Sequence, residues 1–215
     1  MTRVIICAGG PVEELCDLLS YVNKETVVIG ADRGSLYCIA QGITPTIMIG
    51  DFDSVTAEEW QKLQQTNAEI ERYPAEKDDT DTNLALQRAL ALTPTEVIVT
   101  GVTGGRLDHY EAVLRKIYEL QQDYPHITWQ IASRRNHIRF LLPGTTKLTK
   151  SDLAYVSFFA YGGDVSSVTI RGLKYETTNE PMPLTCGLFT SNEFVGEAAT
   201  ISFEENTIMM IMSED

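Results

Sequence analysis

The chain has 215 residues, of which 43% are hydrophobic and 22% are charged, and its formal net charge at pH 7 is −13. This composition is typical of a folded globular protein and excludes intrinsic disorder and collagen-like repeats. The negative charge argues against nucleic acids and anionic membrane surfaces as partners, because both are themselves negatively charged.

The first part of the chain, up to about residue 132, alternates short apolar runs with helical patterns. The runs are rich in valine and isoleucine, which predicts strands covered on both faces. They lie at residues 4–7, 26–29, 46–49, 68–72, 96–100 and 127–131. Apolar residues at three- and four-residue steps predict helices over 82–92 and 107–118. This alternation predicts an α/β domain with a parallel sheet and helices on both faces.

The pattern changes after Asn136, where strand-like runs follow one another without helices between them. These runs lie at residues 137–142, 154–159, 165–170, 187–190, 198–203 and 207–212. Turn residues such as Gly162-Gly163-Asp164 separate them. We therefore expect a domain boundary near residues 133–136, with an α/β domain at 1–134 and an all-β, sandwich-like domain at 135–215.

Four predicted strands of the first part lead directly into segments that combine glycine with polar or charged residues. These segments lie at 8–10, 30–34, 50–54 and 101–108. Because ligands gather at the carboxyl ends of parallel strands, the segments predict a site at one edge of the sheet. Gly9-Gly10 fits either a tight turn or a close approach to a phosphate. The chain contains neither a P-loop motif nor GxGxxG.

Asp51 and Asp53, in Gly50-Asp51-Phe52-Asp53-Ser54, form a more specific motif than Gly9-Gly10. Alternate residues of an extended segment point to the same side, so both carboxylates can face one ion. Carboxylate oxygens suit Mg²⁺, which commonly also binds substrate phosphates. The alternative is an aspartate-rich turn that caps a helix beginning at Thr56, with Ser54 or Asp53 as its N-cap.

A second acidic cluster lies at residues 76–81, where four of six residues are acids. At least one of Asp78, Asp79 and Asp81 is expected to complete the metal site. The alternative is a solvated loop followed by a helix start, since acids are favoured at helix N-termini.

Arg106 and Asp108 follow Gly104-Gly105 in the next polar segment. The Arg106 guanidinium is suited to hold a phosphate in a bidentate grip. Asp108 could orient a substrate or cap the helix that begins at Leu107. None of the three histidines stands in a catalytic context, and His109 alone is near the expected site.

The four cysteines are Cys7, Cys16, Cys38 and Cys186, and they form no CxxC pair. We expect buried free thiols and a cytoplasmic protein rather than a disulfide or a metal cluster. No apolar run approaches the roughly 20 residues of a membrane-spanning helix. The first residues also lack the pattern of a signal peptide.

Taken in order, the motifs resemble those of bacterial thiamine pyrophosphokinases, over nearly the whole chain. The matching segments are Asp32-Arg33-Gly34, Gly50-Asp51-Phe52-Asp53-Ser54, Lys77-Asp78-Asp79-Thr80-Asp81, Thr103-Gly104-Gly105-Arg106-Leu107-Asp108-His109, Gly172-Leu173-Lys174-Tyr175 and Thr190-Ser191-Asn192-Glu193. The resemblance implies an α/β domain followed by a β-sandwich. It also implies a homodimer with sites at the subunit interface, and transfer of the pyrophosphoryl group of ATP to the thiamine hydroxyl with Mg²⁺, releasing AMP.

The resemblance also assigns roles to residues. It implies metal-centred acids at Asp51, Asp53 and Asp81, which with Arg106 and Asp108 form the catalytic set. It implies nucleotide contacts from the first domain, at Asp32, Arg33, Lys77, Asp78, Thr103 and Gly104. It implies thiamine contacts and dimerisation through the second domain, with Tyr175, Ser191 and Asn192 as the contacts.

The implied reaction requires alignment of the thiamine hydroxyl with the β-phosphorus of ATP and neutralisation of the growing phosphate charge. Mg²⁺ with Arg106 or Lys77 would supply positive charge, and Asp108 could accept the hydroxyl proton. Two alternatives stay open. The segment 47–55 also resembles the motif of haloacid-dehalogenase-type phosphatases, although that motif usually opens its fold. A non-catalytic thiamine or nucleotide sensor is the other alternative.

Overall fold

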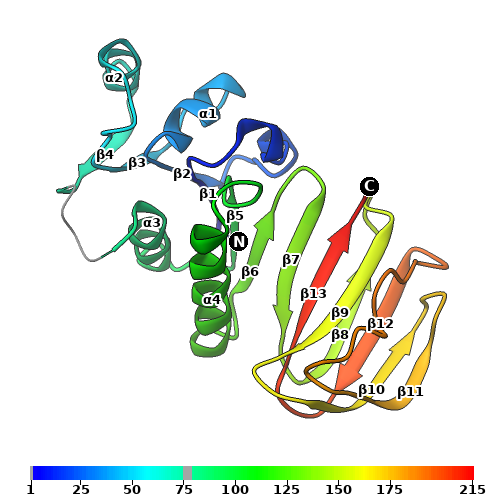
Figure 1. Cartoon of the computed structure of the whole chain (residues 1–215). Coiled ribbons are helices and arrows are strands. Elements are labelled where there is room, and N and C mark those ends of the chain that lie inside the picture. The colour runs from blue at the N-terminus through cyan, green and yellow to red at the C-terminus, as the bar shows by residue number, and fades with distance from the viewer. Residues whose placement is uncertain (1, 75–78) are drawn as a thin grey trace. The chain divides into compact units, whose positions relative to one another are not determined.

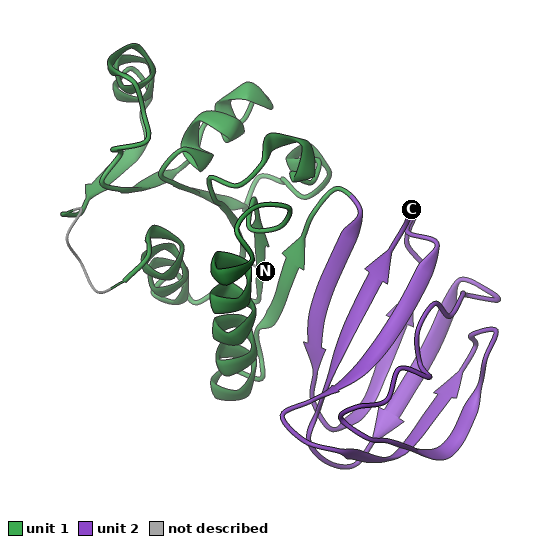
Figure 2. Ribbon diagram, in the orientation of Figure 1, with its two compact units in different colours: residues 1–134 green, residues 135–215 purple. Residues whose placement is uncertain are grey.

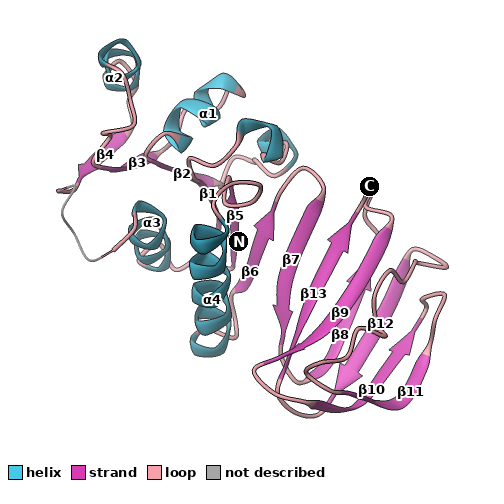
Figure 3. Ribbon diagram, viewed as in Figure 1, coloured by secondary structure: helices cyan, strands magenta, loops and turns pink. Residues whose placement is uncertain are grey.

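The structure is a computed structural model that describes residues 2–74 and 79–215. The chain divides into two compact units, Met1–Arg134 and Arg135–Asp215 (Figure 2). Within the described residues the helices belong to the first unit, whereas the second consists of strands and loops (Figure 3). None of the helices among the described residues is long and apolar enough to cross a membrane.

The first unit is built on parallel strands in the order β4-β3-β2-β1-β5-β6. Their bounds are β1 Arg3–Cys7, β2 Val27–Ala31, β3 Ile47–Gly50, β4 Glu69–Arg72, β5 Glu96–Thr100 and β6 Thr128–Ala132. The predicted parallel sheet is therefore confirmed. The order reverses between β1 and β5, and this is the point at which ligands bind in open α/β sheets.

Helices cover both faces of this sheet, as the alternating pattern predicts (Figure 1). They are α1 Gly34–Ala40, α2 Ala57–Gln64, α3 Asp81–Leu90 and α4 Leu107–Asp123, with two 3-10 turns at Val12–Glu14 and Leu18–Ser20. The central strand β1 is fully buried from Val4 to Cys7. Its Ile5 and Cys7 pack with Cys38 of α1, which shows how alternate strand residues serve one face of the sheet.

The second unit contains seven strands in two antiparallel groups, β7-β13-β9 and β11-β10-β12-β8. Their bounds are β7 Asn136–Leu141, β8 Gly144–Thr149, β9 Tyr155–Tyr161, β10 Val165–Arg171, β11 Thr177–Met182, β12 Ala198–Phe203 and β13 Thr207–Ser213. Side chains of both groups, such as Phe158 and Ile201, share one buried core. The expected all-β, sandwich-like arrangement is thus confirmed.

Two strands of this unit, β8 and β11, are not predicted from the sequence. The strand predicted at residues 187–190 is wrong. β8 carries three threonines and β11 carries Pro181, so neither reads as an apolar run. β11 lies at an edge of its group, where a residue without an N–H is tolerated. Residues 187–190 form a turn instead of a strand, closed by a hydrogen bond from Thr190 Oγ1 to the Gly187 carbonyl.

Candidate active site

A cavity of about 710 Å³ lies at the carboxyl ends of the parallel strands of the first unit. The loops after β1, β2, β3 and β5 and the first residues of α3 line it. The loops after β1 and β5 meet closely, because the Gly10 N–H donates to the Gly101 carbonyl at 2.8 Å. A Cβ atom at Gly10 would overlap that carbonyl. Glycine at position 10 is therefore explained by the close approach of the two loops, which is neither the tight turn nor the phosphate contact considered for Gly9-Gly10.

Three carboxylates converge at one side of the cavity. Asp32, Asp51 and Asp53 each offer a carboxylate oxygen, and these oxygens lie within 4.8 Å of one another. Asp32 adopts a left-handed backbone conformation with φ 52°, and its N–H donates to the Ile49 carbonyl of β3 at 2.7 Å. This contact brings the end of β2 against the end of β3 and places Asp32 beside Asp51.

The Asp32 carboxylate is only partly satisfied. Its Oδ2 accepts a hydrogen bond from Ser54 Oγ at 2.7 Å, whereas its Oδ1 is buried and has no partner among residues 2–74 and 79–215. Burial raises the pKa of Asp32, the Ser54 hydrogen bond lowers it, and the charges of Asp81, Asp51 and Asp53 raise it further. A buried, unpartnered oxygen among like charges is where a hard divalent cation would fit.

The helix-capping alternative for Asp53 and Ser54 does not describe the observed helix start. The N-cap of α2 is Thr56, whose side chain accepts from the Glu59 N–H while the Glu59 carboxylate accepts from the Thr56 N–H. Ser54 instead donates to Asp32. The Asp51 Oδ1 accepts from the Asp53 N–H at 3.0 Å, which fixes the turn that brings the two aspartates together.

The second acidic cluster meets the cavity at the start of α3. Asp79 and Asp81 line the cavity, whereas Lys77 and Asp78 lie outside the described residues. Asp81 is the first residue of α3 and Thr80 is its N-cap, so the helix-start interpretation holds for this part of the cluster. The charge of Asp81 nevertheless acts on Asp32, so this residue belongs to the same electrostatic site.

Arg106 and Asp108 form an exposed ion pair at the start of α4. Arg106 Nε and Nη2 donate to the two oxygens of Asp108 at 3.1 and 2.6 Å. The Arg106 hydrogen bonds are the largest cause that lowers the pKa of Asp108 to about 2. Asp108 is therefore a poor proton acceptor while this pair is formed.

The other expected nucleotide contacts occupy different environments. Arg33 lines the cavity, but its guanidinium donates to the Ser54 carbonyl and to the Glu59 carboxylate at 2.7 and 3.0 Å. Thr103 lines the cavity, and its buried Oγ1 has no partner within the residues that the structure describes. Gly104 has φ 77°, and a Cβ atom there would overlap the side chain of Glu14.

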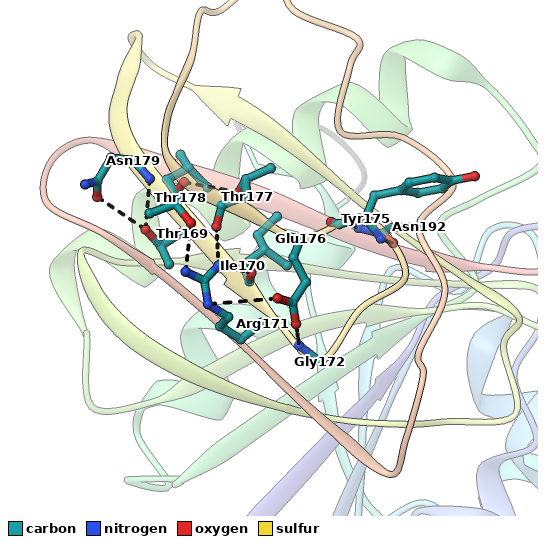
Figure 4. Close-up of polar contacts among 11 residues, drawn as sticks. Thr169, Ile170, Arg171, Gly172, Tyr175, Glu176, Thr177, Thr178, Asn179 and Asn192 are labelled. Carbon is teal, nitrogen blue, oxygen red and sulfur yellow. Dashed lines mark hydrogen bonds and ion pairs between the residues drawn. The ribbon is translucent and has the colours of Figure 1, made fainter.

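The expected thiamine contacts belong to the second unit, where Tyr175 and Asn192 lie side by side (Figure 4). Tyr175 is 60% exposed, on the loop between β10 and β11. Ser191 is exposed and has φ 54°. Asn192, by contrast, is only 4% exposed, and its side-chain amide bonds to the main chain of Tyr175.

Sequence reasoning missed several side-chain contacts around the cavity of the first unit. Ser54 belongs to the motif at residues 50–54, but its hydrogen bond to Asp32 forms only where the loop after β3 meets the loop after β2. Glu59, which holds Arg33, carries only the signal of a capping box. Asp79 accepts hydrogen bonds from Asn83 and Gln87 of α3, a contact that helical spacing alone could have suggested.

Comparisons with known proteins agree across the whole chain. Residues 18–129 match the catalytic domain of thiamin pyrophosphokinase, and residues 145–208 match the vitamin B1 binding domain of thiamin pyrophosphokinase. The thiamine pyrophosphokinase of Bacillus subtilis (strain 168) is 34% identical over 216 residues, covering all of both chains.

Solved structures give the same result. The crystal structure of the Bacillus subtilis thiamine pyrophosphokinase matches with a TM-score of 0.92 at 32% identity, covering 100% of both chains. That of the Geobacillus thermodenitrificans enzyme matches with a TM-score of 0.86 at 36% identity, covering 100% of this chain and 98% of that one. Sequence and fold thus agree along the full length, and the chain belongs to the thiamine pyrophosphokinase family.

Proposed function

We propose that the cavity of the first unit is where this ATP:thiamine diphosphotransferase binds ATP and transfers its pyrophosphoryl group. The thiamine hydroxyl attacks the β-phosphorus of ATP, the bond from that phosphorus to the α-phosphate oxygen breaks, and AMP leaves. One observation carries the proposal: the carboxylates of Asp32, Asp51 and Asp53 converge at the carboxyl ends of β2 and β3, and one oxygen among them is buried with no partner among the described residues.

Asp51, Asp53 and Asp81, together with Asp32, are proposed to hold Mg²⁺. A bound Mg²⁺ would supply positive charge to the ATP phosphates. The chain needs such a charge, because its formal net charge is −13 and its cavity is lined by acids. Burial raises the pKa of Asp32 most, and the charges of Asp81, Asp51 and Asp53 raise it further, so a cation here would relieve part of this repulsion.

Arg106 is proposed to pass from Asp108 to the phosphates when ATP binds. Both side chains of the pair are more than half exposed, so solvent weakens their attraction. A phosphate can therefore replace Asp108 as the partner of Arg106. When the Arg106 guanidinium leaves Asp108, the pKa of Asp108 would rise, and its carboxylate could then accept the proton of the thiamine hydroxyl. Arg33, Lys77, Asp78, Thr103 and Gly104 are proposed to complete the nucleotide contacts.

Thiamine is proposed to bind through the second unit, with its cationic ring system against the exposed ring of Tyr175 and with Ser191 beside it. Stacking of a cation on a tyrosine face contributes about 0.5–2 kcal/mol. We further propose a cytoplasmic homodimer in which each site combines phosphate-binding residues of one subunit with thiamine contacts of its partner. Exposed apolar side chains of the second unit, at Leu184, Leu188 and Val195, support such an interface.

Product analysis tests the site. The purified protein is incubated with thiamine, ATP and Mg²⁺, and we expect AMP and thiamine diphosphate in equal amounts. Asp51→Asn should abolish both, whereas Asp152→Asn, an exposed change outside the cavity, should not. Release of free phosphate alone would support a phosphatase, and binding without turnover would support a sensor.

Subunit exchange tests the composite site. Asp51→Asn and Tyr175→Ala proteins are mixed, exchanged and assayed at low thiamine concentration. Heterodimers would hold one intact site, so we expect part of the activity to return. No recovery after verified exchange, or an active monomer, would refute the shared site and leave the reaction unaffected.

A further inference from the structure

We propose that Asn192 is a positioning residue that fixes the main chain at Tyr175, and that it acts on thiamine only through this contact. The inference rests on the proposed role of Tyr175 in thiamine binding. It departs from the sequence-based expectation, which made Asn192 a thiamine contact in its own right.

The hydrogen-bonding capacity of the Asn192 oxygen is used within the protein. Its Oδ1 accepts from the N–H groups of Tyr175 and Glu193 at 2.9 and 3.0 Å, and a carbonyl oxygen has two lone pairs. Its Nδ2 donates to the Tyr175 carbonyl at 2.9 Å. The amide thus holds both main-chain groups of Tyr175 from a position that is 96% buried, since the residue is 4% exposed.

Asn192 can fix the loop because its own main chain is fixed. Its N–H and C=O pair with Val156 of β9 at 2.9 and 2.8 Å. The amide therefore ties Tyr175, on the loop between β10 and β11, to a strand of the opposite sheet group (Figure 4).

The ends of the same loop have separate anchors. The Gly172 N–H donates to Glu176 Oε1 at 2.7 Å, and Arg171 donates to the Thr177 carbonyl and to Thr178 Oγ1 (Figure 4). Lys174, directly before Tyr175, also donates its N–H to the Glu193 carbonyl at 2.9 Å. Loss of Asn192 should therefore release Tyr175 itself while leaving the neighbouring anchors in place.

The Tyr175 ring depends on this main-chain anchor. The ring is 60% exposed, and the aromatic contact described for it is the Lys174 ammonium, 5.7 Å from the ring centroid. Lys174 is itself held by Glu193 at 2.6 Å. Because the ring is mostly exposed, its position is set mainly by the main chain of Tyr175.

Asn192→Asp separates positioning from direct contact, because the two roles predict opposite pH dependence. One aspartate oxygen can still accept from Tyr175 and Glu193, but the other replaces Nδ2 and faces the Tyr175 carbonyl. When ionised it repels that carbonyl, and when protonated its O–H can donate to it as the amide does. A direct contact to cationic thiamine would instead be strengthened by the ionised carboxylate.

The measurement uses Tyr175→Trp as a fluorescent reporter, with and without Asn192→Asp or Asn192→Ala. Thiamine affinity is read from quenching between about pH 8 and about pH 5, the range in which a buried carboxyl titrates. The reporter without a change at 192 corrects for every titration other than that of the introduced carboxyl. The charged side chains around Tyr175 are Glu176, Glu193 and Lys174, and the bond to Glu193 raises the pKa of Lys174, which therefore stays charged over this range. Asn206→Asp is the matched control, because Asn206 Nδ2 also donates to a carbonyl, that of Asp164.

We expect Asn192→Ala to weaken thiamine binding about tenfold and to leave ATP binding unchanged, as the loss of main-chain hydrogen bonds implies. Asn192→Asp should bind weakly near pH 8 and recover on acidification. Affinity unchanged by Asn192→Ala, or Asn192→Asp binding that weakens on acidification, would overturn the proposal. If Asn192→Ala fails to fold, the Asn192→Asp titration decides alone.

A failure of the proposed thiamine site would look different. In that case Tyr175→Ala would leave the thiamine KM unchanged. The anisotropy of the Tyr175→Trp reporter, measured without thiamine and after subtraction of the emission of Trp60 and Trp129 recorded with Tyr175 in place, would still show whether Asn192→Ala releases the loop. Anisotropy that does not fall would overturn the positioning role whatever binds there.

Discussion

Replacing Asp32 by asparagine should stabilise the metal-free protein and remove its response to Mg²⁺. Asparagine keeps an oxygen for Ser54 Oγ and tolerates the left-handed backbone of this position. Its Nδ2 would take the place of the buried Oδ1, which has no partner in the described part of the chain, and would bring a donor into the carboxylate cluster. The change thus removes a like charge without removing the local hydrogen bond.

The size of the effect follows from the spacing of the carboxylates. Two unit charges 4.8 Å apart repel by about 3 kcal/mol at an effective dielectric of about 20. Asp53 is exposed and Asp32 is only half-buried, so solvent screening reduces the gain to about 1–2 kcal/mol. For a chain of this size, that gain corresponds to a rise in melting temperature of about 2–8 °C.

Thermal unfolding of wild type and Asp32→Asn, with and without Mg²⁺ and ATP, measures both parts of the prediction. The folded-state pKa of Asp32 is raised, so its contribution to stability is favourable at low pH and is lost as pH rises through that pKa. The advantage of the variant should therefore be full at neutral pH and shrink toward about pH 4.

Asp152→Asn, an exposed change in the second unit, is the matched control and should alter neither stability nor the response to Mg²⁺. An Asp32→Asn protein that melts no higher than wild type without metal would refute the electrostatic argument. An unchanged stabilisation by Mg²⁺ would refute the metal site.

Three further outcomes are expected. Asp51→Asn and Asp53→Asn should each lower turnover at least about 100-fold with an unchanged circular dichroism spectrum, and near-normal turnover in both would argue against a metal held there. Tyr175→Ala should raise the thiamine KM more than the ATP KM, whereas equal effects on both would contradict a specific contact. Arg106→Ala should return the pKa of the Asp108 carboxyl from about 2 toward its ordinary value near 4, as followed by NMR titration; an unmoved pKa would show that another group sets it.

Much of the fold could be predicted from the sequence because its determinants are local. Buried parallel strands need apolar residues on both faces, so β1 and β5 stand out as continuous apolar runs. β8 and β11 could not be found in this way. Threonine favours strands, but β8 carries a single large apolar residue, Leu148, and so lacks an apolar run. Pro181 is compatible with β11 because the edge position tolerates a residue without an N–H.

The candidate site likewise contains residues that the sequence indicates and residues that only tertiary contacts place. The sequence alone indicated that Asp51, Asp53 and Arg106 follow strand ends, because a change from apolar to polar residues is visible in the chain itself. Only the tertiary structure brought Asp32 into the carboxylate cluster and turned the Asn192 amide toward the main chain of Tyr175. Both arrangements join segments distant in sequence, 17 residues apart for Asn192 and Tyr175. Such contacts depend on how strands and loops meet in space, which residue type and spacing do not specify.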